Sequence, residues 1–283
     1  MTRTLILYET SNDTARMAIR QMSLILGPCK CFPISEFKKE AVDGYTFVIV
    51  GGEGVEPCTT RLNAFVADNK GWLSTKPTAM FLISGDPPGA WSIIKAMSHS
   101  LNNPEAHLEV IPGGANGVEP AQLVDSAMRL RAARSRNLKV MPRDELKKRI
   151  EDILRSELYL ILCTGAGTRV RGTTIGYTYQ DGKVYAFCEG SEKYANLLLN
   201  PSVSLALYTL PEKVGLQISG TAVICYPGTP EYAGMCRLLK RDHQRYLNLP
   251  FQLNGIIITL HKAEYYLAKL KDQGYDSKQT FYF

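Results

Sequence analysis

The chain has 283 residues, a formal net charge of +6, and 45% hydrophobic and 21% charged residues. This length allows two domains with a core each, and the composition is typical of a globular protein that is soluble in water. No apolar run approaches the roughly 20 residues of a membrane helix, and a strand-like segment starts directly at the N-terminus, so we expect no signal peptide, no membrane partner and a cytoplasmic location.

The distribution of charged, cysteine and histidine residues excludes several classes of function. Much of the positive charge lies between Arg129 and Arg149, where nearby acidic residues dilute it and no interleaved aromatics accompany it, so we expect no nucleic-acid partner. The seven cysteines form no Cys-x-x-Cys pair and the four histidines are scattered, which predicts neither disulfides nor a metal site. The sequence also lacks the Gly-x-Ser-x-Gly elbow of hydrolases.

The first half of the chain alternates apolar strands with amphipathic helices. Strands are expected at 3–8, 30–34, 45–50, 77–84 and 107–111, and helices at 14–26, 60–67, 91–101 and 120–134. Strands that are apolar throughout are typical of a parallel sheet that helices cover on both faces. The pattern predicts an α/β flavodoxin-like five-stranded parallel sheet, whose ligands bind beyond the carboxyl ends of the strands.

The loop after the first strand is a candidate anion site in this domain. Its polar side chains stand at the start of the first helix, where backbone amides bind anions: Thr10, Ser11, Asn12 and Thr14. The loop resembles the phosphate loop of flavodoxin-like proteins, but it lacks the usual glycine and carries the acidic residues Glu9 and Asp13. Its alternative role is to cap the helix through Asn12 or Asp13. We therefore expect this domain to hold flavin weakly or not at all.

The predicted domain boundary lies between Arg136 and Pro142, which gives domains at 1–137 and 143–283. A helix at 144–154 is followed by strands expected at 159–163, 169–175, 183–188, 203–209, 214–218, 221–226 and 254–260. A further helix is expected at 230–241. Many short strands with turn residues between them predict a mainly antiparallel β-barrel with flanking helices.

Basic and hydroxyl residues gather between residues 163 and 201. Arg169, Arg171 and Thr173 fall on one strand face at period two. Asp181-Gly182 predicts a hairpin turn that returns the chain as 183–188, and a Gly-Ser-Glu-Lys turn then opens a short helix. Two arginines converging with Ser191, Lys193 and a helix N-terminus would bind a phosphate. The alternative is a solvated strand face followed by an ordinary loop.

A longer motif runs through the same stretch. It reads Ser-x-Lys-x-x-Asn-Leu-x-x-Asn-Pro-x-Val from Ser191 to Val203, and Ile218-Ser219-Gly220-Thr221-Ala222 follows it. With these motifs, the segment from about Glu145 to Tyr226 resembles the FMN-binding split β-barrel of the pyridoxamine 5′-phosphate oxidase-like superfamily. The resemblance implies FMN as cofactor. Its phosphate would be held by Arg169, Arg171, Ser191 and Lys193, and its ribityl chain or ring would contact Thr173, Thr174, Asn196 and Gln217.

The resemblance implies an FMN-dependent oxidoreductase or an electron-transfer protein, with NAD(P)H or a redox partner as the second reactant. It does not imply pyridoxine oxidation, because the residues for that substrate's phosphate are not recognisable. One alternative is a haem-binding or haem-degrading split barrel, with His243 or His261 as the available ligands, and another is a non-catalytic flavin-binding sensor. We expect a homodimer through the barrel domain, since pairing covers exposed sheet edges and the flavin cleft. Aromatic tail residues would pack at that interface or in the core: Tyr265, Tyr275, Phe281 and Tyr282.

Overall fold

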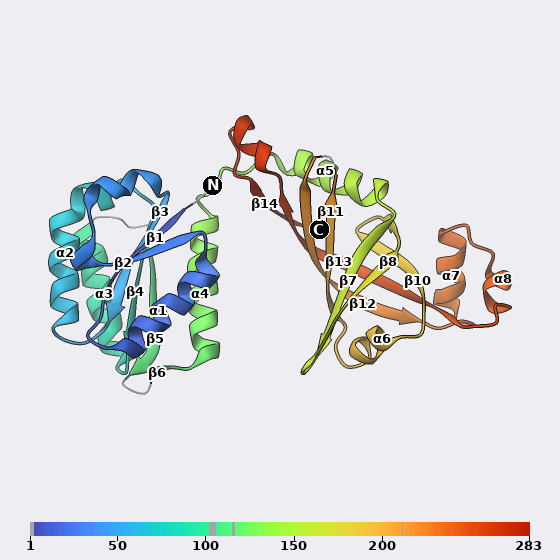
Figure 1. Cartoon of the computed structure of the whole chain (residues 1–283), viewed down its shortest axis with the longest axis horizontal. Helices are drawn as coiled ribbons and strands as arrows, with labels where there is room; N and C mark the ends of the chain where they lie inside the picture. The colour runs from blue at the N-terminus through green and yellow to red at the C-terminus, as the bar shows by residue number, and fades with distance from the viewer. Residues whose placement is uncertain (1–2, 102–105, 115–116, 211) are drawn as a thin grey trace. The chain divides into compact units, whose positions relative to one another are not determined.

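The computed structural model describes residues 3–101, 106–114, 117–210 and 212–283. The chain divides into two compact units, Met1–Leu138 and Lys139–Phe283 (Figure 1). Each unit has its own buried apolar core. None of the described helices combines the length and the apolar character that a bilayer crossing requires.

The first unit contains a six-stranded sheet in the order β2-β1-β3-β4-β5-β6. Its strands are β1 (Thr4–Glu9), β2 (Cys29–Pro33), β3 (Phe47–Glu53), β4 (Thr78–Ser84), β5 (His107–Gly114) and β6 (Gly117–Val118). The first five are parallel and follow the order 2-1-3-4-5, which is the flavodoxin-like order, so the predicted fold is confirmed. The antiparallel β6 was not predicted, because a two-residue strand is too short to show periodicity.

Helices cover both faces of this sheet (Figure 1). On one face α1 (Asp13–Leu26) and α4 (Pro120–Ser135) pack against Ile6 and Tyr8 of β1. On the other face α2 (Cys58–Leu73) and α3 (Pro87–Leu101) pack against Leu5 and Leu7. Two short 3₁₀ helices, Ile34–Glu36 and Lys39–Gly44, connect β2 to β3. Burial on both faces explains why these strands are apolar throughout. Because β1, β3 and β4 are parallel, the loops that follow them lie at the same edge of the sheet.

The second unit is an antiparallel sheet of eight strands in the order β8-β7-β11-β12-β13-β10-β9, with β14 paired to β13. Its strands are β7 (Tyr159–Ala166), β8 (Arg169–Gly176), β9 (Thr178–Gln180), β10 (Lys183–Glu189), β11 (Ser202–Thr209), β12 (Val214–Cys225), β13 (Leu253–Tyr266) and β14 (Lys278–Tyr282). Its helices are α5 (Arg143–Ser156), α6 (Glu192–Leu197), α7 (Pro230–Leu238), α8 (His243–Leu247) and a 3₁₀ helix at Ala268–Gln273. This is the predicted split barrel with flanking helices.

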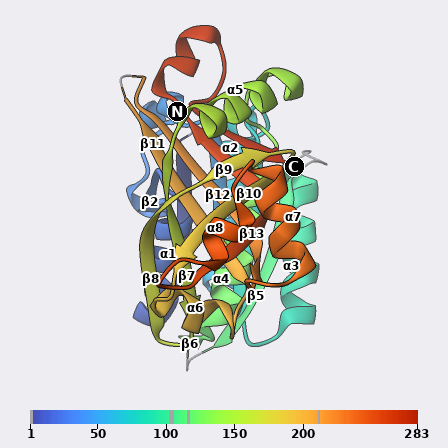
Figure 2. The same ribbon diagram turned by 90° about the vertical axis from the view of Figure 1, so that its right-hand side faces the viewer.

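The two faces of the second sheet differ in their cover. Alternate side chains on one face, here called the inner face, form the core with Leu146, Ile150 and Leu154 of α5. On the outer face, α7 and α8 pack over the end of the sheet formed by β10, β12 and β13 (Figure 2). Of the predicted tail aromatics, Tyr265 and Phe281 are buried in the core and Tyr282 is 60% exposed.

The predicted hairpin has different strands from those expected. Asp181 and Gly182 form its turn with positive φ values of 49° and 74°, as a type I′ turn requires, but they join β10 to the short β9. β8 instead pairs with β7 across the Gly167 turn. The strand pattern breaks at Gly176, and a periodicity that resumes directly afterwards conceals such a break.

Two other sequence boundaries were wrong. The segments 214–218 and 221–226 form one strand, β12, because the register shifts at Ser219/Gly220 without ending the pairing with β13. Gly220 fits there because a Cβ atom would lie 2.6 Å from the Thr259 carbonyl oxygen. The helix expected at 230–241 ends at Leu238, and a new helix, α8, begins after Asp242, which caps it.

Candidate functional site

The inner face of β8 carries three of the predicted residues. Arg171 lies opposite Thr164 and Thr173 lies opposite Leu162 in the antiparallel register of β7 and β8. Thr164 and Leu162 are buried, so their partners on β8 point toward the inner face. Arg169 shares this face by its spacing, and both arginines are exposed. The two guanidinium groups therefore stand at the end of a row of core side chains.

Lys193 is the most buried cation of the α6 turn, with only 4% of its surface exposed. Its Nζ donates hydrogen bonds to Glu189 O at 3.0 Å and to Ser191 Oγ at 2.9 Å. It also lies 4.8 Å from the centre of the Tyr194 ring. Within the described residues Lys193 makes no ion pair. A buried ammonium that contacts only neutral groups is stabilised when an anion comes near.

An ion pair connects the two elements of the cluster. Arg171 Nη1 donates to a carboxylate oxygen of Glu192, the first residue of α6. The side chains are 42% and 78% exposed, so the pair contributes only about 0–1 kcal/mol to stability. Ser191 precedes α6 at the N-cap position and makes no capping bond. The sequence did not reveal that Glu192 forms an ion pair with Arg171, a predicted phosphate-binding residue, because this contact depends on how β8 pairs in the sheet.

Asn196 lies behind this turn and is 2% exposed. Its Nδ2 donates to Thr164 O at 3.3 Å and to Thr164 Oγ1 at 3.1 Å, which fixes α6 on β7. Among the described residues, Asn196 Oδ1 and Thr173 Oγ1 are buried without a hydrogen-bond partner. Buried polar atoms in folded proteins almost always have a partner. The two unpaired oxygens therefore mark positions where polar groups of a ligand or water fit.

Two predicted contacts lie on the opposite face of the sheet. Thr174 follows Thr173 directly in β8, so the two side chains point to opposite faces. Gln217 alternates with the buried Leu216 and Ile218 and is exposed on the outer face. The structure thus places Arg169, Arg171 and Thr173 on the inner face of β8 and Ser191, Lys193 and Asn196 on the α6 turn that contacts this strand through Arg171 and Glu192. It separates Thr174 and Gln217 from them within one chain.

The surroundings of the cluster leave space beside one arginine. An open hollow of about 500 Å³ is lined by Gly165, Ala166, Gly167, Arg169, Leu199 and Asn200. Asn200 Nδ2 donates to Gly165 O at 2.9 Å and holds one wall in place. Burial raises the pKa of Tyr194, whose hydroxyl donates to Cys188 O at 3.1 Å, so this phenol stays a neutral donor at physiological pH.

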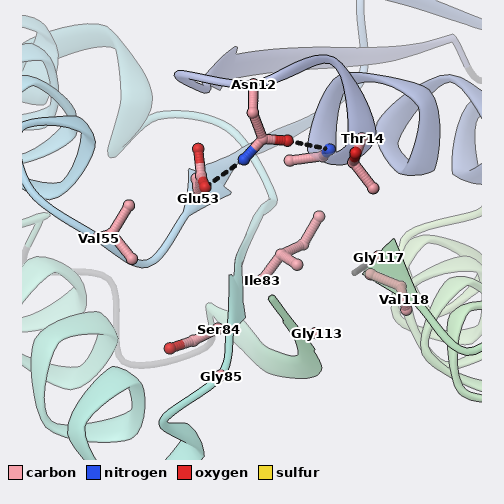
Figure 3. Close-up of a pocket in the computed structure, with 11 residues that line it drawn as sticks. Asn12, Thr14, Glu53, Val55, Ile83, Ser84, Gly85, Gly113, Gly117 and Val118 are labelled. Carbon is pink, nitrogen blue, oxygen red and sulfur yellow. Dashed lines mark hydrogen bonds between the residues drawn. The ribbon is translucent and has the colours of Figure 1, made fainter. Parts of the chain in front are cut away.

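The candidate loop of the first unit is occupied by a carboxylate from its own chain. Glu53, at the end of β3, accepts hydrogen bonds from Ser11 N at 3.0 Å and from Ser11 Oγ at 2.7 Å. It also accepts a hydrogen bond from Asn12 Nδ2 (Figure 3). Thr10 Oγ1 lies 3.4 Å from the same carboxylate. Asn12 Oδ1 also accepts from Ala15 N at 2.8 Å, so Asn12 caps α1 as the alternative prediction stated.

The Glu53 carboxylate occupies the position that an anion bound by the hydrogen-bond donors of this loop would take. Thr14 lines the adjacent cavity of about 210 Å³ together with Glu53, Ile83 and Val118 (Figure 3). Glu9 adds a second, largely buried carboxylate, which is paired with Arg61 at 2.8 Å. The sequence did not predict that Glu53 bonds to the loop after β1. A signal was present, because Glu53 directly follows the glycines that end an apolar strand, and adjacent parallel strands end at the same edge of a sheet.

No family model matches the sequence, and no curated protein matches it. Solved structures do match. They include a pyridoxamine 5′-phosphate oxidase-related protein from Listeria innocua, with 16% identity and a TM-score of 0.35 over 42% of this chain and 95% of that chain. A Clostridium acetobutylicum protein related to general stress protein 26 shows 18% identity and a TM-score of 0.39 over 50% and 97%. HutZ, a haem storage protein from Vibrio cholerae, shows 13% identity and a TM-score of 0.34 over 43% and 94%.

Proposed function

We propose that the second unit binds FMN at the inner-face cluster and that the protein is an FMN-dependent oxidoreductase or electron-transfer protein. The observation that carries the proposal is the buried Lys193 ammonium, which contacts only neutral groups beside Ser191 and follows Glu192, the ion-pair partner of Arg171. A phosphate dianion supplies the missing negative charge. Arginine and serine are suited to hold its oxygens through charge-assisted hydrogen bonds.

The remaining residues of the cluster fit the rest of the cofactor. Thr173 Oγ1 and Asn196 Oδ1 are the unpaired oxygens, and they match the hydroxyl-rich ribityl chain of FMN. When bound, the flavin supplies hydride and one-electron chemistry. The chain's own part is to anchor the phosphate, to orient the ring and to exclude water. NAD(P)H or a redox partner would provide or accept the electrons.

We further propose that the protein is a homodimer through the uncovered part of the outer face. Apolar side chains are exposed there on three adjacent strands: Tyr159 and Ile161 on β7, Tyr208 on β11 and Val223 on β12. Thr174 and Gln217 lie on the same face. Pairing of two copies would bury the apolar side chains and bring these two polar residues next to a second chain.

The dimer is tested by placing a charge on this face. Ile161→Asp is expected to convert a dimer into a monomer at micromolar concentration, because a buried carboxylate without a partner costs more than the interface gains. Light scattering measures the mass. Leu24→Asp is the matched control, since Leu24 is 83% exposed on α1 of the first unit. A wild-type protein that is monomeric with flavin bound contradicts the proposal.

An absorption spectrum of the purified protein tests the cofactor directly. Flavin bands support the proposal, and their bleaching by NAD(P)H under anaerobic conditions separates an oxidoreductase from a flavin sensor. A Soret band supports the haem alternative instead. For that alternative, His243 Nε2 is buried with its ring beside Tyr232, and His261 Nε2 lies 2.8 Å from Thr221 Oγ1. Iron binding through His261 Nε2 would break this hydrogen bond, and binding through His243 Nε2 would require the buried atom to become accessible.

A further inference from the structure

Two cysteines, Cys29 and Cys31, lie two residues apart on β2, an edge strand of the first sheet. Residues at this spacing point to the same face of a strand. Both side chains pack against the core that contains α1 and α4, whereas Phe32 packs against the core on the other face. Both thiols are free and partly exposed, so reagents can reach them.

The two thiols interact with each other and with α1. A hydrogen bond from Cys29 is the main reason that the pKa of Cys31 falls to about 7; burial opposes this effect, and Ser23 and Arg20 add to it. The same hydrogen bond, and then burial, raise the pKa of Cys29, while Arg134 on α4 acts in the opposite direction. At neutral pH, Cys31 is therefore partly a thiolate, and Cys29, whose thiol also donates to Lys30 O at 3.7 Å, stays protonated beside it.

We propose that Cys29 and Cys31 form a redox-active dithiol that reacts with peroxides, in which Cys31 is the nucleophile and Cys29 is the resolving thiol. The Cys31 thiolate attacks one peroxide oxygen, the O–O bond breaks, and hydroxide leaves as Cys31 becomes a sulfenic acid. The Cys29 sulfur then attacks the Cys31 sulfur. An S–S bond forms, the S–O bond breaks, and the hydroxyl group leaves with the Cys29 proton as water.

The position of the pair on the strand makes the resulting disulfide easy to reduce. A rise of ~3.3 Å per residue separates the two Cα atoms by about 6.6 Å, and the parallel side chains keep the Cβ atoms about as far apart, beyond the roughly 3.5–4.5 Å of a disulfide. The strand must therefore bend between the two residues before the bond closes, and the bond that forms is strained. A strained, exposed disulfide has a high reduction potential and suits reversible oxidation. β2 is an edge strand that pairs with β1, so the bend disturbs this one strand ladder.

Site-resolved alkylation of the full-length protein tests the nucleophile. With limiting iodoacetamide at pH 7, peptide mapping is expected to show Cys31 labelled roughly tenfold faster than Cys163, the other partly exposed thiol. The labelling rate should rise with pH and level off above about pH 7, because the thiolate fraction then saturates. Cys29→Ala should slow Cys31 labelling several-fold at pH 7, and wild-type mapping decides if that variant does not fold.

Treatment with one equivalent of hydrogen peroxide tests the resolving step. The expected product is a Cys29–Cys31 disulfide, seen as the loss of two hydrogen masses from one peptide and restored by dithiothreitol. In Cys29→Ala, the same treatment should leave a sulfenic acid on Cys31 that dimedone traps. Equal labelling of Cys31 and Cys163 in the wild type, or peroxide oxidation without an internal disulfide, overturns the proposal.

Discussion

Arg171→Ala is expected to weaken FMN binding about 10- to 100-fold and to leave riboflavin binding nearly unchanged. A hydrogen bond to a charged group contributes ~1.5–3 kcal/mol, and this range corresponds to that loss of affinity. Riboflavin lacks the phosphate, so it does not depend on the guanidinium group. The comparison of the two ligands by fluorescence quenching therefore separates loss of the phosphate contact from general damage to the site.

Removal of the ion pair between Arg171 and Glu192 should change FMN affinity in the opposite direction. Glu192→Gln removes the carboxylate that occupies Arg171, so it should strengthen FMN binding by several-fold and not affect riboflavin. Tyr185→Phe is the control without an expected effect on phosphate affinity. If Arg171→Ala binds FMN as tightly as the wild type, the phosphate is not held at β8.

Lys193→Ala should also weaken FMN about 10- to 100-fold, but its effect should not add to that of Arg171→Ala, because both cations act on one dianion. The buried lysine also joins Glu189 O and Ser191 Oγ, so this variant should lose stability as well. Urea unfolding of the flavin-free protein measures that part. Losses that add fully in the double variant indicate two independent anion sites.

The sequence predicted the fold better than the strand boundaries. The apolar strands of the first unit show their type clearly because they are buried on both faces, and their order follows from the alternation of strand and helix. In the second unit, β8 and β9 are separated only by the break after Gly176, and β12 continues through Gly220. Pairing with distant strands decides such boundaries, and local periodicity does not contain that information.

The sequence predicted which residues are polar and near the α6 turn, but not how they are used. Period two correctly placed Arg169, Arg171 and Thr173 on one face. It equally implies that Thr174 points the other way, so Thr173 and Thr174 cannot reach one ligand from the same face. Carboxylates of the same chain that compete with a phosphate for these donors are harder to predict. Glu192 and Glu53 contact their partners only after the sheets have formed.

Glu53→Ala is expected to give the first unit a second, weaker FMN site. In the wild type, the Glu53 carboxylate takes the donors of Ser11 and Asn12 that a phosphate would need. Two like charges about 4 Å apart at an effective dielectric constant near 20 repel each other by ~4 kcal/mol, so we expect phosphate to bind poorly beside this side chain. Removal of the carboxylate frees the amide and hydroxyl groups at the start of α1, where an anion is favoured.

The measurement is the number of FMN molecules bound per chain, by equilibrium dialysis of the full-length protein. We expect one in the wild type and a second, weaker one in Glu53→Ala. Asp13→Ala is the matched control, because it removes a neighbouring negative charge that pairs with Arg16 but frees no donor of the loop. The lost hydrogen bonds should also lower the free energy of unfolding by about 1–3 kcal/mol. Two molecules bound to the wild type, or none gained in Glu53→Ala, contradict the view that Glu53 keeps phosphate out of this loop.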